Sequence, residues 1–259
     1  SEGRNEQIIK TDQDNALVVK DGIDVEQYRP YMNEITKHLI DFGYPPCEGN
    51  IMVSNPFWCK TVSEYKNETK RWIEAPDMQN YMDLAIFFDS FAVAGDKDLL
   101  INLKDDLFNK LHDKDVFMAY FAKATLTFDT PNTIANFMTK SHNIDIKKAA
   151  VFPIVQGIRS LALREKIRET TTVKRIKILE EKKILERSKA AELLEAFDVV
   201  NTLRLKAQLD DIQDNKEVNN EIDTHTLGKI ERDLLKDSFK IVIEFKKFIN
   251  YTFRIDKIS

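Results

Sequence analysis

Hydrophobic and polar positions follow two different patterns along the chain, and the change between them lies near residue 100. Before it, short apolar runs are bounded by Gly, Pro, Asp or Asn, which is typical of β-strands. The runs predicted as strands are 16–19, 50–54 and 84–88. One helix is predicted among them, over roughly 25–42, because apolar residues recur there at steps of three and four. Pro30 lies inside this pattern and predicts a separate or kinked first turn, and Gly43 predicts the helix end.

After residue 100 the apolar positions recur with helical spacing almost throughout. Helices are predicted over roughly 103–124 and 146–167, and two more follow from longer apolar stripes. These stripes consist of Ala190, Leu193, Phe197, Val200, Leu203 and Ala207, and of Ile230, Leu234, Ile241, Phe245, Phe248 and Thr252. The polar segment 214–226 predicts a loop. Consecutive amphipathic helices with short links form a bundle. We therefore predict an α+β fold, with a small α/β head containing a mixed sheet over 1–100 and a helical bundle over 101–259.

Composition narrows the functional classes. The chain has 259 residues, which is room for two domains, and 42% of them are hydrophobic, which excludes wholesale disorder. A net charge of −4 shows no overall basic character, so a nucleic-acid partner is not expected. No apolar run approaches the roughly 20 residues that a membrane-spanning helix needs, so no membrane association is expected. Cys47 and Cys59 are the only cysteines, too few for a disulfide scaffold, which favours a cytoplasmic location.

Two carboxylates stand two residues apart, Asp12 and Asp14, immediately before the apolar run 16–19. On a strand, this spacing places both side chains on one face. Like charges on one face repel unless a cation neutralises them, and an all-oxygen site suits Mg²⁺ or Mn²⁺. A solvated acidic turn is the alternative. Upstream, small residues and Arg4 offer N–H groups, a hydroxyl and a guanidinium to a phosphate. A phosphate-binding turn followed by a metal-binding pair is what nucleotidyl transfer requires.

A family resemblance rests on these same residues. The segments 1–7 (SEGRNEQ) and 11–16 (TDQDNA) resemble the signature of the DNA polymerase beta-like nucleotidyltransferase superfamily. More closely, the chain resembles bacterial nucleotidyltransferases related to protein-PII uridylyltransferase, which commonly lie downstream of cyclic-nucleotide-binding and CBS modules. The similarity continues through segments 44–52, 55–58, 86–89, 152–163 and 231–237. It implies upstream regulatory domains, a role in signal transduction, and a helical substrate-binding domain after the catalytic head.

The resemblance also implies roles for individual residues. Ser1, Gly3 and Arg4 become candidates for binding the triphosphate of an NTP, and Asp12 and Asp14 become ligands of Mg²⁺ or Mn²⁺.

In that superfamily a third carboxylate normally comes from a neighbouring strand. Asp89 follows the predicted strand 84–88, so it is the first candidate for third metal ligand and for general base to the acceptor hydroxyl. Asp83 and Asp96 are weaker alternatives.

Three departures from the family pattern bear on activity. The glycine expected before Ser1 is absent because the sequence begins there, so we expect a head that lacks its N-terminal strand. Relatives carry an arginine shortly after the position of Asp89, whereas Ser90 and Phe91 follow here. Gln13 is polar where the superfamily prefers an apolar residue.

Two functions remain open from the sequence. The first is metal-dependent transfer of a nucleoside monophosphate from an NTP to an acceptor. A protein is a candidate acceptor, as in the uridylyltransferase relatives. The second is a catalytically weakened nucleotide-sensing or protein-interaction module. A transferase acting on nucleic acid is disfavoured by the acidic charge balance. Arg159, Arg204 and Gln208, polar residues on otherwise apolar helical stretches, would either point into a cleft between head and bundle or form hydrogen bonds within the bundle.

Overall fold

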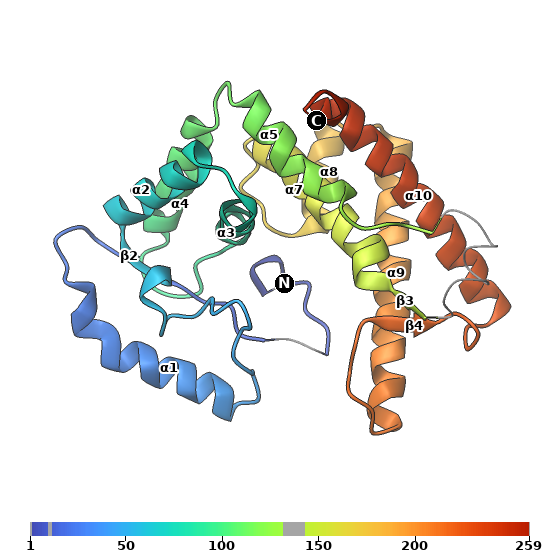
Figure 1. The fold of residues 1–259 in the computed structure, drawn as a ribbon, viewed down its shortest axis with the longest axis horizontal. Helices are drawn as coiled ribbons and strands as arrows, with labels where there is room; N and C mark the ends of the chain where they lie inside the picture. The colour runs from blue at the N-terminus through green and yellow to red at the C-terminus, as the bar shows by residue number, and fades with distance from the viewer. Residues whose placement is uncertain (1, 10–11, 132–142, 259) are drawn as a thin grey trace. The chain divides into compact units, whose positions relative to one another are not determined.

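The computed structural model describes residues 2–9, 12–131 and 143–258, and the chain divides into two compact units, Ser1–Asp113 and Lys114–Ser259 (Figure 1). The predicted α+β architecture is confirmed, with few short strands, many helices and a helical C-terminal part. In place of the predicted mixed sheet, the described residues of the head form a parallel pair of strands. The division follows helix α4, Lys97–Lys110, whereas a boundary at residue 100 would cut through this helix. None of the helices in the described ranges is long and apolar enough to cross a membrane.

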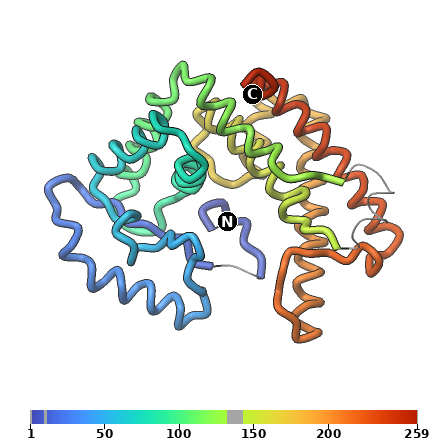
Figure 2. Tube along the Cα trace, viewed as in Figure 1, coloured from blue at the N-terminus to red at the C-terminus, as the bar shows by residue number. Residues whose placement is uncertain are grey.

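The first unit contains a parallel pair of short strands and a set of helices (Figures 1 and 2). Its elements in chain order are the 3₁₀ helix η1 (Glu2–Arg4), strand β1 (Leu17–Val19), η2 (Val25–Tyr28), α1 (Arg29–Asp41), η3 (Pro56–Trp58), β2 (Cys59–Thr61), α2 (Val62–Glu74), α3 (Met78–Phe88) and α4. Leu17 pairs with Cys59 and Val19 with Thr61. The predicted strand at 16–19 and the separate first turn of the helix at 25–42 are therefore confirmed.

An aromatic cluster joins α2 to α3. The ring centroids of Tyr65 and Phe87 are 5.7 Å apart, and those of Trp72 and Phe87 are 5.9 Å apart. All three side chains are buried. Such pairs add to the free energy gained by burial of their apolar area. The cluster fixes the C-terminal end of α3, where Asp89 follows.

Two predicted strands are wrong. The run 84–88 forms the last turns of α3, because a short, wholly apolar run fits a buried helix as well as a buried strand. The run 50–54 is a turn segment, and the strand that pairs with β1 lies later, at β2. The side chain of Asn15 accepts from Val53 N at 2.8 Å, while its N–H donates to Ile51 O at 3.0 Å. These bonds hold 50–54 as a turn beside β1.

The second unit is a helical bundle with one antiparallel strand pair. Its elements are α5 (Asp115–Lys123), η4 (Ala124–Leu126), β3 (Asn143–Asp145), the π-helical turn η5 (Lys147–Val151), α7 (Phe152–Arg164), α8 (Thr172–Glu181), α9 (Arg187–Gln213), β4 (Glu221–Asp223), α10 (Lys229–Phe253) and η6 (Ile255–Lys257). The predicted helix 103–124 is two helices, since the chain leaves α4 and turns at Asp113, which has a φ of 58°. The predicted helix 146–167 is confirmed as η5 followed by α7.

The apolar face of α10 differs from the predicted one. Ile230 and Leu234 are 76% and 42% exposed. The buried positions are Leu235, Phe239, Val242, Phe245, Ile249 and Phe253. A helix with apolar residues on several sides offers more than one stripe, and packing selects one of them. On α9 the predicted stripe is buried from Ala190 to Leu203.

The predicted loop 214–226 contains β4, which pairs with β3. Two polar side chains of α9 hold the residues before this strand. Arg204 Nε donates to Asn220 Oδ1 at 2.7 Å, and Gln208 Nε2 donates to Asn219 O at 3.0 Å. Of the two interpretations of Arg204 and Gln208, these contacts support hydrogen bonding within the bundle.

Helices α7 and α10 approach each other closely at Gly157. A Cβ there would lie 2.5 Å from Cε1 of Phe245 and 3.0 Å from Cγ1 of Ile249. We expect Gly157→Ala to lower the free energy of unfolding by about 1–3 kcal/mol, because overpacking outweighs the roughly 1 kcal/mol gained in helix propensity. Urea denaturation followed by circular dichroism measures the change. Thr202→Ala, at an exposed position of α9, is the control and should stay within about 0.5 kcal/mol of wild type.

Glu169 stabilises the start of α8. Its Oε1 accepts from Thr170 N at 2.8 Å and from Thr171 N at 3.1 Å, and its Oε2 lies 3.4 Å from Lys174 Nζ. Burial by itself raises the pKa of Glu169, but these N–H donors and Lys174 outweigh it and lower the pKa below 4.5. A carboxyl with a lowered pKa contributes stability above its ordinary pKa and loses it as the pH falls through the folded-state pKa.

The pH dependence of unfolding tests this contribution. We expect Glu169→Gln to lower the free energy of unfolding by about 1 kcal/mol at pH 7, because the charge-assisted bonds weaken. The difference from wild type should shrink as the pH falls through the lowered folded-state pKa of Glu169, because the wild-type carboxyl then also becomes neutral. Glu181→Gln, at the exposed end of the same helix, is the matched control. A difference that persists unchanged at acid pH would contradict the assignment.

Candidate functional site

Gln13, the middle residue of the Asp-x-Asp sequence, is 1% exposed and anchors the whole segment. Its Nε2 lies 3.3 Å from both Thr36 O and Tyr44 O, and its backbone N–H donates to Pro45 O at 3.1 Å. Gln13 and Pro46 also form a parallel β-bridge. An apolar side chain would leave the two carbonyls without this donor. The polar middle residue therefore ties the segment 12–14 to the segment that follows α1.

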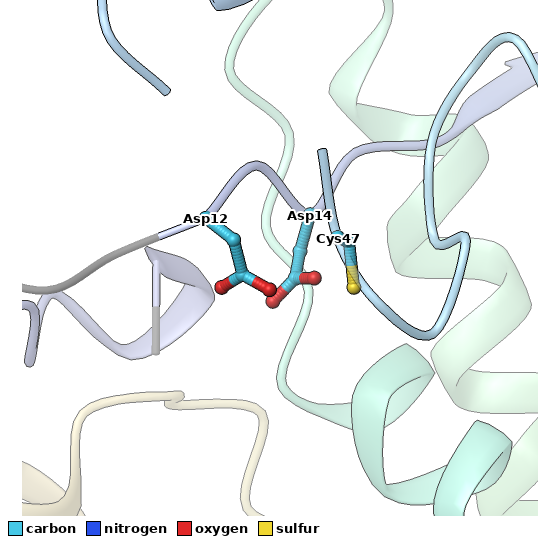
Figure 3. A group of neighbouring side chains, drawn as sticks. All are labelled: Asp12, Asp14 and Cys47. Atoms are coloured by element: carbon cyan, nitrogen blue, oxygen red, sulfur yellow. The ribbon is translucent and has the colours of Figure 1, made fainter. Parts of the chain in front are cut away.

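The anchoring of Gln13 determines where its neighbours point. In extended backbone, successive side chains lie on opposite faces, so Asp12 and Asp14 share the face that Gln13 does not use. Cys47 follows directly after the bridged Pro46. One carboxylate oxygen of each aspartate and the Sγ of Cys47 lie within 4.8 Å of one another. Figure 3 shows the three side chains directed to the same side.

The cluster includes a buried carboxylate oxygen. Asp14 Oδ1 is buried and has no hydrogen-bond partner among the described residues. Leaving a buried polar group without a partner costs about 1–3 kcal/mol, and more for a charged group. Burial, and next the carboxylate of Asp14, raise the pKa of the Cys47 thiol to about 11. The carboxylate pair predicted from the sequence is thus brought together, and a thiol joins it.

Arg4 forms a second cluster in the same unit. Its Nη1 lies 2.7 Å from Asp89 Oδ2 and its Nε 2.7 Å from Glu6 Oε2, and the side chains of Arg4 and Asp89 are 15% and 6% exposed. Burial alone lowers the pKa of Arg4, but the carboxylates of Asp89 and Glu6 outweigh it and raise the pKa above its ordinary value. Gly3 lies directly on this contact, because a Cβ there would be 2.1 Å from Asp89 O. Only glycine allows η1 to approach Asp89 so closely.

Asp89 does not lie at a strand end as predicted. It is the residue that ends α3, it pairs with Arg4, and it does not belong to the cluster of Asp12, Asp14 and Cys47. Its roles as third metal ligand and general base stay predictions. Ser1 lies outside the described residues.

The two alternative carboxylates have other local roles. Asp83 is buried within α3, where its Oδ1 accepts from Gln79 and burial raises its pKa. Asp96 caps the start of α4 by accepting from Asp98 N at 3.1 Å.

Two residues at these clusters were not predicted. The ammonium of Lys104, a buried residue of α4, donates to Ser90 O at 2.6 Å, so a positive charge from another helix reaches the residue after Asp89. No spacing in the sequence connects Lys104 to this position. Cys47 lies in the segment 44–52 that carries the family resemblance, but a single cysteine gives no signal until the fold places it beside Asp14.

The comparisons with known families agree with both units. Residues 115–253 match the family model described as "Putative nucleotidyltransferase substrate binding domain", and residues 1–79 match the one described as "Putative nucleotidyltransferase DUF294". The chain belongs to this nucleotidyltransferase family. The nucleotidyltransferase match covers both clusters described above, apart from Asp89 and Lys104, which lie beyond residue 79. The substrate-binding match lies within the second unit. A comparison with curated proteins gave no match.

Proposed function

We propose that this nucleotidyltransferase moves a nucleoside monophosphate from an NTP to an acceptor in a reaction that depends on Mg²⁺ or Mn²⁺. The observation that carries the proposal is the convergence of Asp12 and Asp14 within 4.8 Å, with Asp14 Oδ1 buried and without a hydrogen-bond partner among the described residues. Family membership supports nucleotidyl transfer in general, and this geometry supports a cation as the missing partner.

The residues present fit such a cation. Asp12 and Asp14 supply oxygen donors from one face of an extended segment, and Gln13 holds that segment in place from the other side. When bound, a divalent cation would neutralise the triphosphate and stabilise the charge that develops on the leaving pyrophosphate. The task of the two aspartates is to hold the cation where the triphosphate can reach it.

Arg4 is the proposed triphosphate contact. Its Nε and Nη1 are used by Glu6 and Asp89, and no hydrogen bond joins its Nη2 to another described residue. A guanidinium held on two sides presents its remaining N–H groups in a defined direction, which suits phosphate oxygens. We assign Asp89 first to holding Arg4, and its proposed action as general base is tested separately by Asp89→Asn.

The acceptor is proposed to be a protein bound by the second unit. This part of the proposal is supported by the match of residues 115–253 to a substrate-binding domain and by the resemblance to protein-PII uridylyltransferase. Upstream regulatory domains, of the cyclic-nucleotide-binding or CBS kind, belong to the same proposal.

One experiment tests the function and names the nucleotide. Calorimetric titrations with ATP, GTP, CTP and UTP, each with Mg²⁺ or Mn²⁺, are combined with measurement of pyrophosphate release in the presence of candidate acceptor proteins. Metal-dependent binding of one NTP with pyrophosphate release is the expected result. No binding of any NTP with either metal would overturn the proposal.

A second function remains a candidate because two carboxylates already bind the guanidinium of Arg4. If they hold the guanidinium away from the triphosphate, the first unit would bind nucleotide without turnover. It would then act as a nucleotide-sensing or protein-interaction module. Metal-dependent NTP binding without pyrophosphate release, with every acceptor tried, favours this function.

A further inference from the structure

The cluster of Asp12, Asp14 and Cys47 has a donor set that differs from an all-oxygen site. Two of its ligand atoms are carboxylate oxygens and the third is a sulfur, and all lie within 4.8 Å of one another. Mg²⁺ is a hard cation that takes oxygen ligands, whereas Zn²⁺ accepts both thiolate sulfur and carboxylate oxygen. The thiol therefore changes which cation the site prefers.

The position of the sulfur is built into the fold. Cys47 lies on the segment after α1, and the bridge between Gln13 and Pro46 holds that segment beside Asp14. The backbone bond from Gln13 N to Pro45 O and the side-chain contact with Tyr44 O support the same alignment. These contacts of Gln13 hold the three donors beside one another, and the Asp14 carboxylate also forms a hydrogen bond with the Cys47 thiol.

The spacing fits a small tetrahedral ion. Bond lengths of about 2.3 Å to sulfur and about 2.1 Å to oxygen place such ligands roughly 3.4–3.6 Å apart around Zn²⁺. Donor atoms already within 4.8 Å need to close by about 1.4 Å at most. Asp14 Oδ1 is buried and has no hydrogen-bond partner among the described residues, and a bound cation would supply one. Three protein ligands leave a fourth position for water or a phosphate oxygen.

We propose that Cys47 is a third ligand of the Asp12–Asp14 site and makes it select a thiophilic divalent cation of the Zn²⁺ class over Mg²⁺. This inference rests on the proposed function in one respect, that the two aspartates hold a cation. In the absence of nucleotide, the identity of the bound cation then depends on Cys47, and Zn²⁺ displaces Mg²⁺ from the nucleotide-free site.

The test uses Cd²⁺ as a spectroscopic probe and Zn²⁺ as a competitor, with the full chain and without nucleotide. A cadmium–thiolate bond gives an ultraviolet charge-transfer band, so the readout does not depend on activity. We expect the band to saturate at one Cd²⁺ per chain, to be removed by stoichiometric Zn²⁺, and to persist in a large excess of Mg²⁺. Cys47→Ser should abolish the band and weaken Zn²⁺ binding by tenfold or more, on the order expected for loss of a soft ligand.

Two controls separate the site from simple thiol binding. Cys59, whose Sγ donates to Val53 O at 2.8 Å, lies outside the cluster, and Cys59→Ala should keep the band. Asp12→Asn with Asp14→Asn should weaken the band together with Zn²⁺ affinity. If Cys59→Ala does not fold, protection of Cys47 from alkylation by Zn²⁺, mapped by mass spectrometry on the wild-type chain, replaces it.

The outcomes distinguish this inference from the proposed function. Absence of the band in wild type, an unchanged band in Cys47→Ser, or removal of Cd²⁺ by Mg²⁺ as readily as by Zn²⁺ would each overturn the inference. An unchanged band in the double asparagine variant would also do so, because the thiol would then bind alone. If the chain binds an NTP with Mg²⁺ but shows no band, the proposed function stands and this inference fails. If the band is present but no NTP binds, the metal site stands and the proposed function fails.

Discussion

Replacement of both carboxylates, Asp12→Asn with Asp14→Asn, is expected to reduce nucleotidyl transfer by at least about 1000-fold, equal to roughly 4 kcal/mol of transition-state stabilisation. The amide oxygens keep the shape of the side chains but carry no charge, so they neither hold the cation nor balance its charge. Metal-dependent NTP binding should be lost with activity. Pyrophosphate release and calorimetry measure the two effects.

The same replacement should not unfold the chain. It removes two like charges that lie close together and the charge on the buried Asp14 Oδ1, so the melting temperature should stay the same or rise. Glu34→Gln with Asp41→Asn is the matched control, because it removes the same charge from exposed positions of the first unit. Retention of activity in the Asp12–Asp14 variant, or equal loss in the control, would contradict the proposed role of the pair.

Arg4→Ala is expected to have the largest effect on stability among the residues of the site. Removal of the guanidinium removes the 2.7 Å ion pair with Asp89, whose side chain is 6% exposed. Breaking a charge-assisted hydrogen bond at a buried group costs about 2–3 kcal/mol in the free energy of unfolding. The same variant should weaken NTP binding, because the proposed triphosphate contact is lost. Chemical denaturation and calorimetry provide the two measurements.

An ion pair with an exposed arginine in the same unit provides the comparison. Arg71 bonds to Glu68, and its side chain is 52% exposed. Arg71→Ala should therefore cost less than about 1 kcal/mol and leave NTP binding unchanged. A similar small cost for Arg4→Ala would show that the contact with Asp89 does not hold η1. Normal NTP binding in Arg4→Ala would show that Arg4 does not contact the triphosphate.

The pairing of Arg4 with Asp89 also explains why Gly3 stands where it does. Since a Cβ at Gly3 would overlap the carbonyl oxygen of Asp89, the small residue is needed for the approach of η1. In the sequence, Gly3 and Arg4 are candidates for phosphate binding on the strength of residue type and resemblance. The structure adds a positioning role that neither of these signals contains.

Several features of this protein are determined by local sequence. The change of apolar spacing near residue 100 predicts a head with short strands and a helical bundle, because strand and helix periods are properties of neighbouring residues. The strand at 16–19, the separate turn before α1 and the buried stripe of α9 follow from the same periods. The spacing of Asp12 and Asp14 places both on one face, which depends only on extended backbone.

Other features were decided by tertiary packing. The run 84–88 became a helix because the aromatic cluster with α2 buries it, and α10 buried a different stripe because its neighbours select the face. The partners of Asp89 and Asp14 come from segments 85 and 33 residues away, Arg4 and Cys47. Periodicity contains no information about contacts at such separations. Asp12 and Asp14 could thus be paired from the sequence, whereas the thiol beside them and the arginine on Asp89 could be located only in the folded chain.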